Sequence, residues 1–330
     1  MNRPATLALR LALALLVLIP ALGSSAAAAQ APLPVTIYQT EFEFSEGYRT
    51  SLDLAGQNNW TIAGQDGNGI LTNAFPGQGQ QAYIGFSTNR ATFEHAALFR
   101  PLNFNPLQSG LPIVRFTVLL NIQDSSTTNR DSFRWSIYAT NAAAGAVRLF
   151  TLDFDNHTQN ICYNLEASTD FVPTPYSFAN QTTYRLELIL NFARNRWSAL
   201  LDNTEIVTLQ PITTKNTPLN LADIDAVRYL RNTNYPGDNY MIFDNYSVSA
   251  EPIANADPVL HPLTYPTNGQ FKFLAFVEPL VRHTLETSDD LRQWRTLATH
   301  ISPDPTFEFA DTTAIPGHPA RFYRIRSPNP

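Results

Sequence analysis

The chain has very little of three things: cysteine, lysine and long hydrophobic runs. Its 330 residues include one cysteine, Cys162, and two lysines, Lys215 and Lys272. A single cysteine excludes an internal disulfide, so stability must come from burial of a core. Cys162 lies in a strand-like run, and we expect it to be a small buried side chain. The alternatives are an intermolecular disulfide and a reactive nucleophile.

Charged residues are also scarce, and acidic residues outnumber basic ones. Charged residues make up 15% of the chain, with 22 basic against 28 acidic side chains. Residues 1–29 hold two of the arginines and no acid, which leaves 20 basic against 28 acidic residues, a net charge of −8, for the remainder. Nucleic acids are bound through basic patches, so this balance argues against a nucleic-acid partner. It also argues against binding anionic glycans through bulk charge.

The one clear hydrophobic run lies at the start. Two arginines accompany an apolar stretch from Leu11 to Ile19, and Ala27 and Ala29 form an A-x-A site. The stretch is shorter than the roughly 20 residues that span a bilayer. The pattern is that of a secretory signal peptide over residues 1–29. We therefore expect an exported protein that does not span the membrane, located outside the cell, in the periplasm or on the cell surface.

Helical patterns are nearly absent from the rest of the chain. The best candidate, Leu219 to Ile224, predicts a short turn at most. Alternation of apolar and polar residues instead recurs from about residue 35 to 250, which predicts β-strands. It is clearest in Val114–Ile122, Phe133–Tyr138 and Tyr184–Phe192, each with one apolar face.

Tight turns connect several of these strands. Arg194-Asn195 separates the strand ending at Phe192 from one beginning at Trp197, and Asp202-Asn203 leads into Glu205–Leu209. Three such strands form an antiparallel meander. Because each strand has one apolar face, a second sheet must cover it, so we predict a β-sandwich.

The composition of the sequence changes near residue 250. A proline-rich stretch, 253–266, predicts a stiff and poorly paired linker. Short strand patterns then follow in 267–328, which predicts a small β-sandwich of immunoglobulin or fibronectin type. The main domain is expected over 33–252. The later strands are expected at Gln270–Phe276, Val281–Thr287, Trp294–Ile301, Thr306–Phe309 and Arg321–Ile325.

Two resemblances fit this division. The stretches Trp197–Asp202, Phe243–Tyr246 and Phe42–Trp60 resemble parts of concanavalin A-like, laminin-G-type jelly rolls. The runs Leu285–Leu291 and Phe307–Asp311, with Trp294 and Arg321–Arg324, are similar to a small module that ends many exported proteins of the Verrucomicrobia and their relatives. The resemblance implies an all-β protein, a jelly roll followed by a small β-sandwich, of bacterial origin. It identifies no activity, because such folds host lectins, hydrolases and lyases alike.

Signatures of catalysis are missing. The chain has no H-E-x-x-H motif of zinc proteases and no G-x-S-x-G motif of serine hydrolases. It also has no E-x-D-x-x-E run of the kind found in laminarinase-type jelly rolls. Glu41 and Glu43 share a predicted strand face, as do Asp153 and Asp155, and such pairs can serve acid–base chemistry or Ca²⁺ binding. Ordinary exposed strand faces near the edges of a sheet are the expected reading of both pairs. Asp66 opens a turn with the oxygen donors of a calcium site, but the turn is too short for an EF-hand loop, and we expect a plain hairpin or loop turn. No cofactor is otherwise expected.

Polar strand faces are the better indication of function. If their strands are neighbours, six side chains form a surface with donors, acceptors and an aromatic platform, which suits sugar hydroxyls and rings. These candidate ligand-binding residues are Arg115, Arg134, Tyr138, Arg185, Glu187 and Asn191. Ordinary solvent-facing decoration of a sheet is the alternative.

The sequence therefore favours an exported, noncatalytic binding or surface-associated protein with a glycan as its ligand. A polysaccharide lyase or glycoside hydrolase with a site assembled from distant strands is one alternative. A structural envelope or matrix protein is another. The sequence leaves the oligomeric state open.

Overall fold

The computed structural model describes residues 33–85, 94–143, 145–166, 168–253, 258–263, 270–313 and 321–327. The expected signal peptide lies outside these residues. Within them, regular structure is almost entirely β-strand, and the helical elements are η1 (Phe44–Glu46) and α1 (Pro106–Ser109). None of the described helices is long and apolar enough to cross a membrane.

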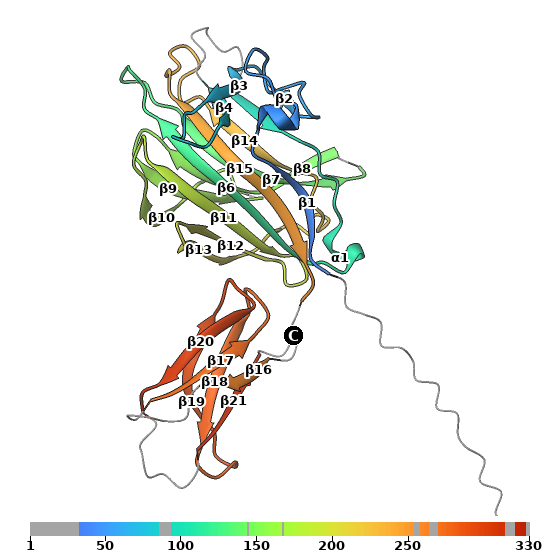
Figure 1. The fold of residues 1–330 in the computed structure, drawn as a ribbon, viewed down its shortest axis with the longest axis vertical. Helices are drawn as coiled ribbons and strands as arrows, with labels where there is room; N and C mark the ends of the chain where they lie inside the picture. Colours follow the sequence, from blue (N-terminus) through green and yellow to red (C-terminus); the bar gives the residue numbers. More distant parts are fainter. Residues whose placement is uncertain are drawn as a thin grey trace, which may run out of the picture. The chain divides into compact units, whose positions relative to one another are not determined.

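Two large antiparallel sheets face each other in residues 35–251 (Figure 1). The first sheet has the order β13-β12-β11-β6-β15-β4-β3, and β1 pairs with β15. Its strands are β1 (Val35–Thr40), β3 (Asn68–Thr72), β4 (Gln80–Gly85), β6 (Ile113–Gln123), β11 (Thr183–Asn191), β12 (Arg196–Leu201), β13 (Thr204–Gln210) and β15 (Tyr240–Glu251).

The second sheet has the order β10-β9-β8-β7-β14-β5-β2. Its strands are β2 (Thr61–Ala63), β5 (His95–Phe99), β7 (Ser132–Asn141), β8 (Gly145–Asp155), β9 (Asn160–Leu165), β10 (Val172–Ser177) and β14 (Asp223–Tyr229). The all-β sandwich predicted from the alternation is thereby confirmed.

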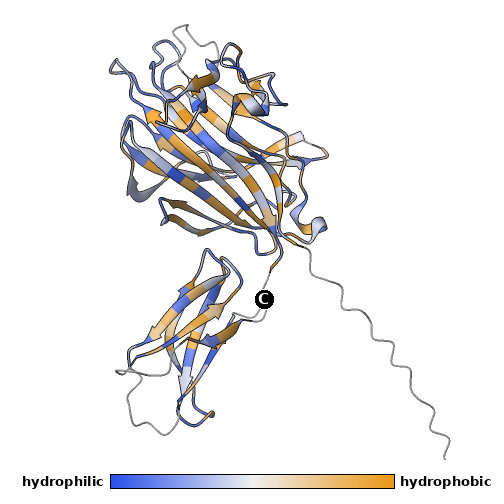
Figure 2. Ribbon diagram, viewed as in Figure 1, coloured by the Kyte–Doolittle hydropathy of each residue, from blue (hydrophilic) through white to orange (hydrophobic). Residues whose placement is uncertain are grey.

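Aromatic side chains fill the space between the sheets. Phe116 of β6 and Trp135 of β7 lie with ring centroids 5.1 Å apart, and Phe150 of β8 stacks on Trp197 of β12 at 3.9 Å. All four side chains are buried. Such rings bury a large apolar area, and their packing holds the two sheets together. Figure 2 shows the alternation of apolar and polar residues along the strands that makes this core.

The predicted meander is present. β11 pairs with β12 and β12 with β13, both antiparallel. Asn195, Asp202 and Asn203 have positive φ angles of 51°, 47° and 63°. Asparagine and aspartate tolerate this left-handed conformation better than most residues, which is why these positions make tight turns.

The turn expected at Leu219–Ile224 was wrong. Leu221 forms a β-bridge with Phe104, and β14 begins at Asp223. β14 then pairs with both β5 and β7. So short an apolar segment cannot hold a helix by itself, and long-range pairing determines its structure.

The C-terminal residues form two three-stranded antiparallel sheets, β16-β17-β20 and β19-β18-β21. Each expected strand is present. The strands are β16 (Val259–Pro262), β17 (Phe271–Phe276), β18 (Arg282–Ser288), β19 (Arg295–Ile301), β20 (Thr306–Asp311) and β21 (Phe322–Arg326). Among the described residues, each sheet is formed by strands that lie either entirely before residue 252 or entirely after it.

One part of the expected linker is paired. β16 lies inside 253–266 and pairs with β17. It is an edge strand, where proline is tolerated because one side of the strand needs no hydrogen-bond donors. The immunoglobulin-type character of this region stays a prediction.

Candidate ligand-binding site

The six candidate residues do not form one surface. Four of them lie on neighbouring strands of the first sheet, and Arg134 and Tyr138 lie on β7 of the second sheet. The condition that their strands be neighbours is met for β6 and β11 only. The four on the first sheet are Arg115, Arg185, Glu187 and Asn191. Whether any of the six contacts a ligand stays a prediction.

The four residues of the first sheet are engaged in polar contacts of their own. Arg115 Nη1 lies 3.1 Å from Glu187 Oε1, and its Nε lies 2.9 Å from Glu251 Oε1. Arg185 Nη1 lies 2.8 Å from the other oxygen of Glu187. Burial alone would lower the pKa of Arg115, but the two carboxylates raise it on balance. Asn191 accepts a hydrogen bond from the backbone N–H of Arg194 at 3.0 Å.

Arg134 is likewise fixed within the protein. Its Nε donates to Asp153 Oδ1 at 2.6 Å, and its guanidinium carbon lies 3.8 Å from the Tyr229 ring centroid and 4.7 Å from that of Phe171. Burial raises the pKa of Asp153 to about 6, although Arg134 acts to lower it. Arg134 therefore neutralises a buried carboxyl between two rings, which is a structural role in its own right.

Beside Tyr138 lies an acid pair that the sequence analysis missed. The register pairs Tyr138 with Asp223, and Asp225 follows two residues along β14 on the same face. The two carboxyl groups share a hydrogen bond, and burial raises the pKa of both, that of Asp225 far above its ordinary value. Burial and the charge of Asp225 also raise the pKa of Tyr138 to about 12. The D-x-D spacing was visible in the sequence, but the turn expected over Leu219–Ile224 obscured it.

This acid pair is poorly accessible. Asp223 and Asp225 are 8% and 5% exposed, and Asp225 Oδ1 has no hydrogen-bond partner in the described part of the chain. Two carboxyl groups that share one proton carry a single negative charge, which reduces the cost of burying them. Retaining and inverting glycosidases both hold their two carboxyl groups about 5 Å or more apart. The hydrogen-bonded pair Asp223 and Asp225 is too close for either type.

Two adjoining hollows lie along β1, where the surface is open. The larger has a volume of about 420 Å³ and the smaller about 280 Å³. Gln39, Thr40 and Glu46 line both. The larger is also lined by Glu41, Thr117, Asn245, Tyr246 and Ser247, and the smaller by Tyr38, Tyr48, Asn58, Asn59 and Arg100.

A bulge and a short helical turn shape the larger hollow. The register of β15 against β6 shifts between Asp244 and Ser247, and Asn245 there has a φ of 50°. Bulges of this kind redirect side chains and often lie next to binding sites. At the end of β1, Glu46 Oε2 accepts hydrogen bonds from the backbone N–H groups of Glu41 and Glu43 at 3.0 and 2.9 Å. This capping fixes the turn of chain that borders the hollow.

Aromatic and amide groups line the smaller hollow. The hydroxyl groups of Tyr38 and Tyr48 are 2.9 Å apart. Arg100 stacks on the Tyr38 ring at 4.0 Å, and its Nε donates to the Asn58 carbonyl at 3.2 Å. Asn58 and Asn59 have φ angles of 46° and 66°. Consecutive left-handed residues are costly, and they are found where surrounding contacts impose the conformation, often at functional sites.

The paired carboxylates that the sequence singled out separate in the structure. Glu41 and Glu43 follow the end of β1 instead of sharing a strand face. Glu41 lines the larger hollow, whereas Glu43 Oε1 accepts from the Gln80 backbone N–H at 3.0 Å. Asp153 binds Arg134, and Asp155 binds Arg231.

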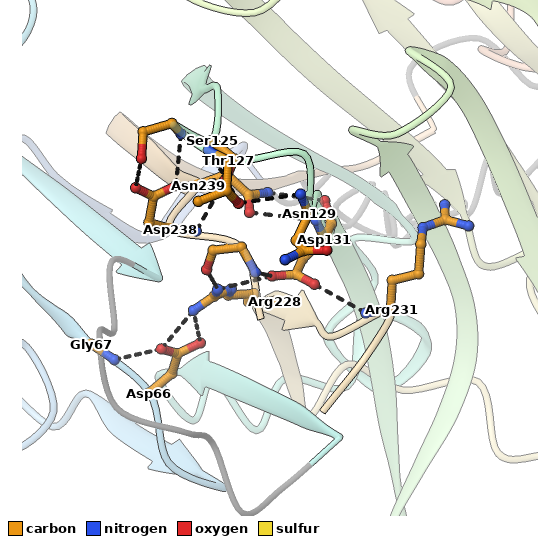
Figure 3. Close-up of polar contacts among 12 residues, drawn as sticks. Asp66, Gly67, Ser125, Thr127, Asn129, Asp131, Arg228, Arg231, Asp238 and Asn239 are labelled. Atoms are coloured by element: carbon orange, nitrogen blue, oxygen red, sulfur yellow. Dashed lines mark hydrogen bonds and ion pairs between the residues drawn. The ribbon is translucent and has the colours of Figure 1, made fainter. Parts of the chain in front are cut away.

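The carboxylate of Asp66, at the turn that resembled a calcium site, is paired with an arginine. Figure 3 shows Arg228 between Asp66 and Asp131, with its two Nη atoms 2.8 and 2.9 Å from their carboxylates. Burial raises the pKa of Asp66, and Arg228 opposes that shift. A cation at this turn would therefore compete with a buried guanidinium. Among the described residues, no group of three or more His, Cys, Asp or Glu side chains is placed to hold a metal.

Cys162 is half-buried instead of buried. Its register partner on β8 is Asp153. Burial, and then the charges of Asp153 and Asp155, raise the pKa of the thiol to about 11. A raised pKa keeps the sulfur protonated at neutral pH, which disfavours the nucleophile alternative.

No protein-family model matches the chain, and no curated protein matches it. Distantly similar solved structures include lectin II from Ulex europaeus, 7% identical over 66% of this chain and 98% of that one, with a TM-score of 0.44. A Bacillus subtilis protein of unknown function with a galectin-like fold is 12% identical over 67% and 99%, with a TM-score of 0.41. A sialidase is 12% identical over 64% of this chain and 18% of its own length, with a TM-score of 0.45. These likenesses are too distant to support a particular activity or ligand.

Proposed function

We propose that this chain is an exported, noncatalytic carbohydrate-binding protein whose sugar site is the pair of hollows along β1. The observation that carries the proposal is the lining of these hollows. Planar amide and carboxyl groups, hydroxyl groups and a tyrosine ring surround a space of about 420 Å³ and its smaller neighbour. Sugars are held by such groups, which grip adjacent hydroxyls while a ring supplies apolar contact.

Gln39 is the residue that tests this site most cleanly. It lines both hollows, it is exposed, and its side chain makes no hydrogen bond to the described residues. Its removal therefore costs the fold little but deprives a ligand of an amide donor and acceptor. One lost hydrogen bond lowers affinity about 3- to 10-fold.

The experiment measures retention of the purified chain on cellulose, xylan, chitin and mixed β-glucan, together with any oligosaccharide released. We expect retention without release, weakened about 3- to 10-fold in Gln39→Ala. Gln108→Ala is the control, because Gln108 is an exposed glutamine on α1 outside both hollows. Equal retention of the two variants would move the site elsewhere, and no retention on any polysaccharide would contradict the proposal.

A polysaccharide lyase is the second candidate, because a close acid pair lies beside Tyr138, whereas the spacing of that pair does not suit a glycoside hydrolase. Release of oligosaccharide that is abolished in Asp225→Asn would favour it. Export rests on the signal-peptide pattern alone, and a mature N-terminus at Gln30 in the secreted protein would support it.

A further inference from the structure

The charges around the larger hollow are of one sign. Its lining contains the carboxylates of Glu41 and Glu46 and no arginine or lysine. In the part of the chain that the structure describes, no ion pair engages Glu41, Glu43 or Glu46. The described acids elsewhere on the sandwich often have an arginine, as Asp66, Asp153 and Glu187 do. Counter-charge is thus missing among the residues that line the larger hollow, whereas Arg100 lines the smaller one.

A further carboxyl group lies next to a residue that lines the hollow. Asp244 is buried at the start of the β15 bulge, where its Oδ1 accepts from the Asn245 backbone N–H at 2.7 Å. Burial raises the pKa of Asp244 to about 7, and the nearby charges of Glu43 and Glu41 add to that effect. These three carboxyl groups therefore lie within electrostatic range of one another.

Glu41 is the carboxylate with the most freedom to bind a ligand. Glu46 is committed to capping the turn, and Glu43 Oε1 to the Gln80 backbone N–H. Glu41 is exposed, and its side chain makes no hydrogen bond or ion pair with any described residue. Around it, Gln39, Asn245 and Ser247 offer neutral donors and acceptors for hydroxyl groups.

We infer that the larger hollow binds an amino sugar in its cationic form, with the ammonium group on the Glu41 carboxylate and the ring hydroxyls on Gln39, Asn245 and Ser247. The inference rests on the proposed carbohydrate site and specifies its ligand class. Uronic acids, sialic acids and sulfated sugars are excluded by like-charge repulsion. An N-acetylated sugar loses the ion pair and keeps only the neutral contacts.

The test compares two probes that differ in one group. Calorimetry measures binding of a glucosamine tetramer and of its fully N-acetylated counterpart to the full chain, below neutral pH and at low salt. We expect the amine-bearing tetramer to bind about fivefold more tightly, the effect of one partly exposed ion pair. In 0.5 M salt this preference should shrink, because screening weakens the ion pair but not the neutral hydrogen bonds.

Two matched variants locate the effect. Glu41→Gln should abolish the preference for the amine, whereas Glu308→Gln, which removes an exposed charge on β20, should keep it. Equal affinity for the two tetramers, or a preference unaffected by both Glu41→Gln and salt, would overturn the inference while leaving the carbohydrate site standing. If Glu41→Gln melts at a lower temperature than the parent chain, the variant is not a clean test. The inference is then judged by whether salt weakens the preference of the parent chain for the amine-bearing tetramer. Binding of neutral glycans without binding of either tetramer would also overturn the inference. Absence of binding to every glycan would contradict the proposed function as well.

Discussion

Several charged side chains in this fold are buried, and Arg228 is the most buried of them. Its side chain is 0% exposed between Asp66 and Asp131, which are 2% and 1% exposed. Such a group is costly to bury, but far more costly to leave without its partners. The motif that suggested a calcium turn is thus explained by an internal ion pair.

Replacing Arg228 with methionine should cost about 3–5 kcal/mol of unfolding free energy, because two buried carboxylates lose their counter-charge. Urea unfolding measures the loss. Arg196→Met is the control, since Arg196 is exposed and its change should stay within about 0.5 kcal/mol. A loss below about 1 kcal/mol in Arg228→Met would show that the ion pairs contribute little.

Asp244 should make stability depend on pH. Its pKa in the folded chain is about 7, above its ordinary value of 3.8, so the folded state holds more protons between these values. Stability is therefore highest below about pH 4 for this group, and falls as the pH rises to about 7. We expect the melting temperature of Asp244→Asn to be less sensitive to pH over this range than that of the parent. Parallel pH profiles would contradict the raised pKa.

Elements with strong alternation could be predicted from the sequence, and those without it could not. The strands β6, β7 and β11 each show one apolar face, and the structure has them within a residue or a few of the predicted bounds. β14 was missed although Asp223 and Asp225 alternate with apolar residues, because the turn expected over Leu219–Ile224 covered its start and its pairing partners are distant in sequence.

The candidate site was predicted less well, for a physical reason. Alternation reveals which side chains share a face of one strand, but not which strands become neighbours. Arg134 and Arg115 therefore lie on different sheets. The hollows along β1 combine residues near positions 40, 58, 100, 117 and 245, which only long-range pairing brings together. Glu41 was noticed in the sequence, but as half of a pair with Glu43.

The hairpin between β12 and β13 offers a test at the scale of the element. Asn203 has a φ of 63°, which a β-branched residue adopts at a cost of about 1–2 kcal/mol. Asn203→Val should lose that much in urea unfolding, whereas Asn203→Gly should stay within about 0.5 kcal/mol of the parent. Thr204→Val, one residue further and inside β13, should be tolerated. Equal stability of Asn203→Val and Thr204→Val would argue against the left-handed turn.

For the whole molecule, composition and site agree on the kind of ligand. Residues after position 29 carry a net charge of −8, and the larger hollow is lined by carboxylates without a basic residue. Both features disfavour polyanions, at long range and at the site. The chain has one cysteine, so the sandwich depends on its aromatic core for stability.

The central claim is that this sandwich binds sugars along β1, and a glycan array tests it most directly. The purified chain is applied at low salt to neutral, anionic and amine-bearing glycans, with Gln39→Ala alongside. We expect binding to neutral or amine-bearing glycans, none to anionic ones, and weaker binding of the variant. Binding to anionic glycans alone, or to none, would contradict it.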